Sequence, residues 1–423
     1  MFSAKTELCI FDSTTPQIVV ENGSFEEIFP LNSISGYDAT NEIEFRISGT
    51  TSDYLDLNDT LLFVQVQVRK GTPIDPDTGM KLKGGKTLEK EPVDDIVPVN
   101  YMFHTLFKDV SLYFNNVKIE GGTDTYSHKA LLESIISYTD ETKRMNLTSI
   151  GYDENVNERQ KWIANERKFD MCGSLQLDFL DQPKYLIPGV DVILKLKRNN
   201  FESSLISSNY KPQLNINAAT LLVRRVKVDK AVSIGHQIGL KTKNAIYPYR
   251  KAEMNAHSIN VGAKTFYKEN LFQDYRLPKF VLISFKTTDN YTGKYKNDST
   301  SFGHFNISSI TLSRYSEYRE AYTQDFKTDN YTTSYVTSMI RNMGYLDKNL
   351  NNGITLAKFK SDYPFFTFVL APDFDINQAQ VPKQGNLRLD VRFDNVLKEG
   401  VTMMVYGIFD HDIQINNERV VLA

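Results

Sequence analysis

Strict alternation of apolar and polar side chains is the feature that most constrains the fold of this chain. The segment "NEIEFRIS" places Ile43, Phe45 and Ile47 on one side and charged residues on the other. The segment "TLLFVQVQVRK" repeats the pattern from Leu62 to Val68. Successive side chains of a β-strand point to opposite faces, so a period of two predicts strands with one buried and one wet face. We therefore expect an all-β protein.

Similar runs recur along the whole sequence. The 26 Phe and 23 Tyr residues suit β-structure. In "FKDVSLYFNNVKIEG" the pair Asn115-Asn116 predicts a tight turn between two strands of a hairpin. Further strands are predicted within residues 174–180, 189–198, 218–228, 278–286, 305–312, 364–371, 386–393 and 401–409.

Two short segments show helical spacing instead, and they reveal an internal repeat. Residues 125–138 and 332–344 carry apolar side chains three or four positions apart. Each follows a predicted strand, which begins at Phe107 in the first half and at Phe305 in the second. Corresponding elements are about 200 residues apart, close to half the chain. The sequence therefore predicts two similar domains in tandem.

The expected domains are two jelly rolls. A chain of 423 residues is too long for one ordinary core. An all-β domain with about eight strands, long connections and one short helix is most economically a jelly roll. We expect residues 1–235 to form the N-terminal jelly roll and residues 236–423 the C-terminal one. Each would carry a short flanking helix, with the join near "DKAVSIGHQIGLKTKN".

Composition limits the functional classes. The 49 basic and 52 acidic residues argue against a nucleic-acid binder that works through one large basic surface. Cys9 and Cys172 lie far apart without C-x-x-C spacing, which favours a reducing compartment. The sequence shows no signal-peptide core and no apolar run long enough to span a bilayer. We expect a chain that is made in the cytoplasm or nucleus and is not secreted.

The stretch "DPDTGMKLKGGKTLEKEP", residues 75–92, resembles a phosphate-binding loop. Such a loop needs two glycines with four residues between them, the second followed directly by Lys and Ser or Thr. Gly79 and Gly84 have this separation, but Gly85 intervenes before Lys86. A calcium loop is excluded because its acidic twelfth position is also Lys86. We interpret the stretch as a solvated loop between strands of the first domain.

Asp410 and Asp412 in "FDHDIQ" are the best enzymatic candidates. Two residues apart on a predicted strand, they would point to one side as a carboxylate pair. A double β-sandwich enzyme that cleaves glycans therefore stays open as an alternative, as does a tandem carbohydrate-binding module. Gln414 and Asn416 lie on the same side, however, as on a solvated face. We assign no catalytic residue.

Metal and nucleic-acid sites are weakly indicated. None of the six histidines has the spacing of a metal-ligand pair, so no metal or cofactor site is assigned. A basic cluster near the end of the first domain could contact packaged nucleic acid, but the wet edge of a strand is the favoured interpretation. The histidines are His104, His128, His236, His257, His304 and His411, and the basic cluster comprises Arg224, Arg225, Lys227 and Lys230.

Several long stretches resemble one known family. The most specific is "PLNSISGYDATNEIEFRISGTTSDYLDLNDTLLFVQVQV" from Pro30, joined by "VPVNYMFHTLFKDVSLYFNNVKI" from Val97 and the helix in residues 125–138. In the second half, "LPKFVLISF" from Leu277 and "SFGHFNISSITL" from Ser301 match in the same order. These stretches resemble the double jelly-roll, hexon-like major capsid proteins, most of all those of Polinton (Maverick) elements and adintoviruses.

The resemblance implies a structural protein of a virion capsid. Three chains would form a homotrimer whose six jelly rolls make a pseudo-hexagonal tile, and many tiles would form an icosahedral shell around a DNA genome. The implied partners are neighbouring capsomers, minor capsid (penton) proteins and packaged DNA on the inner face. The family supplies no catalytic residue, cofactor or small-molecule substrate. Two similar domains and a three-fold axis give six similar edges, which agrees with the internal repeat.

Overall fold

The computed structural model describes residues 19–34, 42–49, 52–73, 95–273, 276–314, 318–346, 348–349, 351–371 and 383–422. The first half of the chain folds into a β-sandwich of two four-stranded sheets. One sheet contains β1 (Val20–Ile28), β10 (Tyr210–Val228), β3 (Tyr54–Pro73) and β7 (Lys168–Gly173), and the other contains β2 (Glu42–Ile47), β8 (Val192–Arg198), β5 (Phe107–Phe114) and β6 (Val117–Glu120). A small sheet pairs β4 (Ile96–Pro98) with β9 (Leu205–Ser207).

The second half folds into a second β-sandwich. Its first sheet contains β11 (Ala245–Ile259), β18 (Val401–Ile415), β13 (Phe280–Thr287) and β16 (Phe366–Val369), with β19 (Val421–Leu422) added beside β18. Its second sheet contains β12 (Thr265–Glu269), β17 (Arg388–Phe393), β14 (Ile307–Arg314) and β15 (Tyr318–Thr323).

The two sandwiches have the same topology. When the eight main strands of each are numbered along the chain, both have strand order 1-8-3-6 in one sheet and 2-7-4-5 in the other. Every pairing in these sheets is antiparallel, and this strand order is that of a jelly roll. The predicted all-β fold of two tandem jelly rolls is confirmed, and so is the half-chain repeat.

Helices lie in the connections between strands. In both jelly rolls the predicted helix falls between the fifth and sixth main strands, as α2 in the first and as α7 continued by the π-helix η6 in the second. The expected domain boundary at residues 235–236 falls inside α5, whose first turn is capped by Asp229 through the backbone N–H of Ala231. The helices are α1 (Met102–Thr105), α2 (Tyr126–Ser137), α3 (Asp140–Met145), α4 (Val156–Ile163), α5 (Lys230–Leu240), α6 (Thr288–Thr292), α7 (Thr332–Tyr335), η6 (Val336–Arg341) and α8 (Leu356–Ser361), with 3₁₀ turns η1 (Leu147–Ile150), η2 (Ala164–Glu166), η3 (Asp178–Asp181) and η4 (Phe201–Ser203).

Most predicted strands are present, but the strand expected within residues 174–180 is wrong. This segment is a loop that continues into η3. The backbone N–H groups of Asp178 and Phe179 donate to the Glu120 carboxylate at 3.1 and 3.3 Å. A side chain therefore takes the place that a neighbouring strand would fill. The expected hairpin turn is confirmed, since Asn115 and Asn116 both have positive φ.

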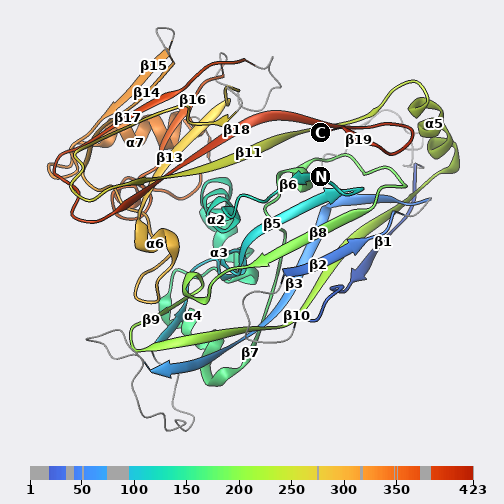
Figure 1. The fold of residues 1–423 in the computed structure, drawn as a ribbon, viewed down its shortest axis with the longest axis horizontal. Coiled ribbons are helices and arrows are strands. Elements are labelled where there is room, and N and C mark those ends of the chain that lie inside the picture. The colour runs from blue at the N-terminus through green and yellow to red at the C-terminus, as the bar shows by residue number, and fades with distance from the viewer. Residues whose placement is uncertain are drawn as a thin grey trace, which may run out of the picture.

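The two jelly rolls pack against each other (Figure 1). The long strands β11 and β18 run along the first jelly roll, and α2 lies between them and the strands of that domain. The alternation seen in the sequence places one face of β3 in the core. Its apolar residues Leu62, Val64, Val66 and Val68 are fully buried. Among the residues that the structure describes, no helix is long and apolar enough to cross a membrane.

Candidate functional site

A buried charged cluster lies where the two jelly rolls meet. Lys129 on α2 is buried, and its Nζ lies 2.8 Å from Glu120 Oε1 and 2.7 Å from Asp178 Oδ1. Glu133, one helical turn further along α2, lies 3.9 Å from the same Nζ. One ammonium group therefore faces three carboxyl groups in the protein interior, where ionic groups are stable only when they are paired.

The second jelly roll completes this cluster. The hydroxyl of Tyr406 on β18 donates to Glu133 Oε1 at 2.9 Å. The backbone N–H of Ala252 on β11 donates to Asp178 Oδ2 at 2.7 Å. The charged cluster therefore contributes directly to the contact between the domains.

Burial governs protonation in the cluster. It raises the pKa of Glu133 to about 7, although the Lys129 ammonium opposes this shift. It also raises the pKa of Asp178 well above its ordinary value, helped by the adjacent Glu120 carboxylate. Burial would lower the pKa of Lys129, but the surrounding carboxyl groups more than offset this and raise it. Lys129 is therefore the fixed positive charge of the cluster.

Two further buried lysines near the junction have carbonyl partners. Lys143 on α3 donates to Ile135 O at 2.6 Å and, across the junction, to Asn352 O at 2.7 Å. Lys286 on β13 donates to the carbonyl of Ser299 and lies over the ring of Phe302. Burial lowers the pKa of Lys143 to about 8 and that of Lys286 to about 7. These two lysines can lose their protons near neutral or mildly alkaline pH.

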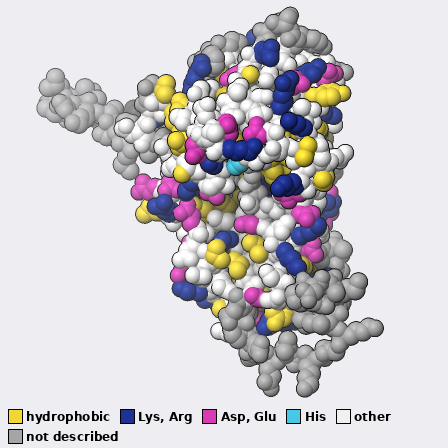
Figure 2. Space-filling view, turned by 90° about the vertical axis from the view of Figure 1, so that its left-hand side faces the viewer, with side chains coloured by type: hydrophobic (Ala, Val, Ile, Leu, Met, Phe, Trp, Pro, Cys, Tyr) yellow, Lys and Arg dark blue, Asp and Glu magenta, His cyan; other side chains and the backbone are white. Residues whose placement is uncertain are grey.

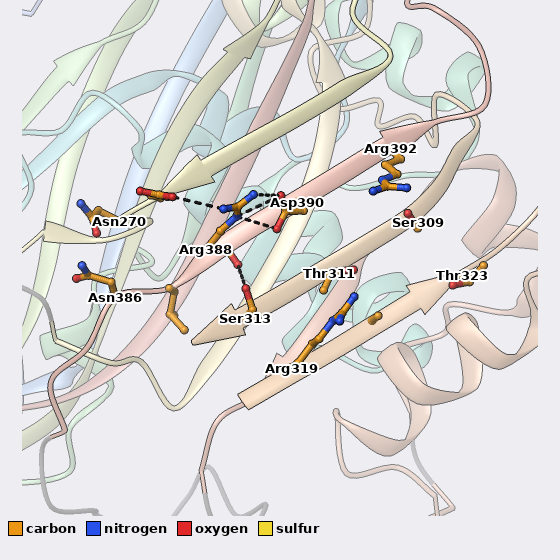
Figure 3. A pocket seen from close by; sticks show the side chains of 13 residues that line it. Asn270, Ser309, Thr311, Ser313, Arg319, Thr323, Asn386, Arg388, Asp390 and Arg392 are labelled. Atoms are coloured by element: carbon orange, nitrogen blue, oxygen red, sulfur yellow. Dashed lines mark hydrogen bonds and ion pairs between the residues drawn. The ribbon is translucent and has the colours of Figure 1, made fainter. Parts of the chain in front are cut away.

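A polar trough of about 790 Å³ lies on the outer face of sheet β12-β17-β14-β15 (Figure 3). Ser309, Thr311 and Ser313 of β14 lie along it, with Arg319 of β15 on one side. The arginines of β17 lie on the other side, where Arg388 binds Asp390 and Glu269. Guanidinium and hydroxyl donors of this kind can hold an oxyanion or a hydroxyl-rich ligand. Composition and spacing did not indicate this trough, because it is assembled across four strands.

The predicted carboxylate pair lies on β18 but is engaged elsewhere. Asp410 Oδ1 lies 2.6 Å from the Nζ of buried Lys279, and Asp412 accepts from Gln414 Nε2 at 3.0 Å. In a glycan-cleaving enzyme the two carboxyl groups flank the scissile bond of the substrate instead of pairing with protein groups. The geometry at Asp410 and Asp412 therefore favours the interpretation as an ordinary polar strand.

The basic cluster at the end of β10 is paired with acidic neighbours. Arg224 Nη1 lies 3.0 Å from Asp56 and 2.7 Å from Asp59. Arg225 pairs with Glu26, Lys227 Nζ lies 2.9 Å from Glu21, and Lys230 is exposed at the start of α5. These pairs favour the interpretation as the polar face of a strand, which lies between β1 and β3, over a phosphate-binding surface. The face shown in Figure 2 likewise intersperses acidic and basic side chains.

The histidines occupy separate environments. Burial lowers the pKa of His104 and of His128 to about 3, and His128 stacks on Tyr291 of α6. His236 hydrogen-bonds the hydroxyl of Tyr54, with 2.8 Å between Nδ1 and the oxygen. Within the described ranges, no group of three or more His, Cys, Asp or Glu side chains could hold a metal ion. The glycine-rich stretch of residues 75–92 lies outside the described residues.

Comparison with known proteins gives one sequence relative and several structural ones. No protein-family model matches the sequence. The uncharacterized protein F54H12.2 of Caenorhabditis elegans is 22% identical over 405 residues, which cover 92% of this chain and 94% of the relative.

The solved structures that resemble the chain are capsid proteins. The Faustovirus major capsid protein matches with a TM-score of 0.62 at 8% identity, covering 97% of this chain and 93% of that one. VP54 of PBCV-1 matches with a TM-score of 0.57 at 11% identity over 96% and 97% of the two chains. The mavirus major capsid protein gives a TM-score of 0.52 at 9% identity over 100% and 95%.

These similarities extend over both domains and agree with the strand order 1-8-3-6 and 2-7-4-5 of each sandwich. The chain therefore has the double jelly-roll fold of the major capsid proteins of large viruses and virophages.

Proposed function

We propose that this chain is a major capsid protein, a structural protein of a virion capsid without an enzymatic role. Three copies form a homotrimer, and its six jelly rolls make a pseudo-hexagonal tile. Many tiles, with minor capsid proteins, build an icosahedral shell around a DNA genome. Weak contacts between tiles suffice for such a shell, because many of them act together.

The observation that carries this proposal is the identical topology of the two jelly rolls. Each main strand of the first domain has a counterpart at the same position in the second. A chain with two equivalent domains and a three-fold axis presents six similar edges to its neighbours. The similarity to three capsid proteins over more than nine-tenths of the chain adds support.

Within the major capsid proteins, we assign this chain to those of Polinton elements and adintoviruses. It is supported by the family resemblance of the sequence and by a relative that spans nearly the whole chain and comes from an animal. We place the division between the domains in α5, where the chain passes from β10 of one jelly roll to β11 of the other. Production in the host cytoplasm or nucleus belongs to the same proposal.

We expect the purified chain to be a trimer in solution. Light scattering coupled to size exclusion should give three times the mass of the 423-residue chain at micromolar concentration. Negative-stain images should show particles with a pseudo-hexagonal outline. A clean monomer over the whole concentration range would contradict the proposal.

A further inference from the structure

An apolar hollow lies beside α5, at the end of the molecule where the chain passes from one jelly roll to the other (Figure 1). Its volume is about 790 Å³, within the range of roughly 300 to 1,000 Å³ that is usual for small-molecule sites. Tyr54 and Val228 of the first jelly roll line it, together with Leu240 of α5 and with Ile246 and Tyr247 of the second. A ligand in the hollow would therefore touch both domains and the helix between them.

The floor of the hollow offers hydrocarbon and no free polar group. Its residues Tyr54, Ile187 and Tyr247 are buried. The Tyr247 hydroxyl accepts from the backbone N–H of Ile187 at 3.1 Å and donates to the carbonyl of Tyr185 at 3.3 Å, and the Tyr54 hydroxyl is bonded to His236. None of the described lining residues has a buried side-chain polar atom without a hydrogen-bond partner. The part of a ligand that enters should therefore be apolar.

The helix α5 leaves this space open because two glycines line it. A side-chain carbon at Gly235 or Gly239 would meet no atom within 4 Å apart from its own chain neighbours and the helix backbone. Glycine is unfavourable inside a helix, so larger residues at these positions would both strengthen α5 and fill the hollow. The open space is therefore maintained at a cost to the helix.

The rim of the hollow is basic. Lys184 and Lys243 line it and are exposed, and no Asp or Glu is among the described residues that line it. The Nζ of Lys184 donates to the carbonyl of Ile246 at 2.7 Å, which holds this ammonium group beside the start of β11. A wall with charge of one sign attracts ligands of the opposite sign. The ligand should therefore carry a negative charge at the rim.

An apolar floor below a basic rim is complementary to an anion with a long hydrocarbon chain. A protein partner would need a contact of roughly 1,000 Å² or more, whereas the hollow has the volume of a single small ligand.

We propose that this hollow binds a free long-chain fatty acid, with the hydrocarbon chain on the floor between the jelly rolls and the carboxylate beside Lys184 and Lys243. The inference goes beyond the proposed capsid function and does not depend on the trimer, because all of these residues belong to one chain.

Palmitate is the first probe. Calorimetry on the purified chain, below the concentration at which palmitate forms micelles, should show one saturable site per chain. Palmitate should also raise the melting temperature, because a ligand that binds only the folded state stabilises it. A chain that binds no palmitate, or binds it without saturation, would overturn the inference.

Gly239→Trp tests the floor. The indole would occupy the space of the hydrocarbon chain, so the affinity for palmitate should fall by about tenfold or more. Ile238→Trp is the matched control, since Ile238 is the adjacent residue of α5, is 60% exposed and does not line the hollow. It should bind palmitate as the unmodified chain does. Unchanged affinity in Gly239→Trp would place the palmitate elsewhere and contradict the proposal.

Lys243→Glu tests the rim and leaves the floor intact. It should weaken palmitate by about tenfold, because repulsion replaces attraction, and leave the affinity for uncharged hexadecanol unchanged. Lys241→Glu is the control, since Lys241 is exposed nearby but does not line the hollow, and its effect on palmitate should be smaller. Equal losses for palmitate and hexadecanol in Lys243→Glu would contradict the role of the lysine.

Vesicles of phosphatidylcholine and phosphatidylglycerol distinguish a free fatty acid from a membrane lipid. The chain should not sediment with them. Sedimentation with these vesicles, combined with no binding of free palmitate, would assign the hollow to a membrane surface and overturn the inference.

Discussion

Lys129→Met is expected to lower the free energy of unfolding by about 3 to 5 kcal/mol, the usual cost of removing one partner from a buried ionic cluster. The substitution leaves Glu120, Asp178 and Glu133 without the ammonium group that they surround. The lost charge matters more than the lost volume, because Met fills similar space. Urea unfolding at pH 8, followed by circular dichroism, measures the difference.

Lys161→Met serves as the control for this prediction. Lys161 on α4 pairs with Glu158 at 2.6 Å, but both side chains are exposed, so its removal should change stability by less than about 1 kcal/mol. The loss of unfolding free energy in the Lys129→Met variant should become smaller towards pH 5, where the unpaired carboxyl groups take up protons. If the Lys129→Met and Lys161→Met variants lose equal amounts of unfolding free energy at pH 8, the charged cluster does not stabilise the contact between the domains.

Stability should rise with pH between about pH 7.5 and pH 8.5, because two buried lysines have a pKa well below the ordinary value of 10.5. Burial lowers the pKa of Lys143 to about 8 and that of Lys286 to about 7. In this range the unfolded chain binds more protons than the folded chain, so raising the pH favours folding. Each lysine contributes at most about 1.4 kcal/mol per pH unit.

The pH range is chosen to isolate the lysines. Glu133, whose pKa is raised to about 7, gives stability that falls as the pH rises towards 7, so measurements begin above that value. Lys286→Met should flatten the dependence of the urea midpoint on pH, and the double variant with Lys143→Met should flatten it further. A wild-type slope that persists in the double variant would assign the effect to other groups.

The sequence predicted many of the main strands and the two connecting helices because these depend on neighbouring residues, but it did not predict β1, β7, β11, β12 or β15. Alternation along β3 and β8, the Asn115-Asn116 turn and the helical spacing in α2 all act over a few residues and could be read directly. The half-chain repeat then predicted two similar domains, and the identical strand orders confirm it. The missed α5 shows the limit of this approach, because Gly235 and Gly239 obscure its helical pattern.

Only the tertiary structure decided which polar residues form buried contacts. Residues 174–180 have the apolar pattern of a strand, but Glu120, far away in sequence, binds their backbone and turns them into η3. Lys129 stands in the sequence as one polar residue of a helix, and its partners Glu120 and Asp178 come from other elements of the first domain. The Tyr406 hydroxyl reaches the cluster only when the two domains pack. Alternation within a strand predicts that one of its faces is buried. It does not predict which distant segment packs against the other face. For that reason the sequence by itself determined two jelly rolls, and the packing of one on the other decided which polar side chains are buried between them.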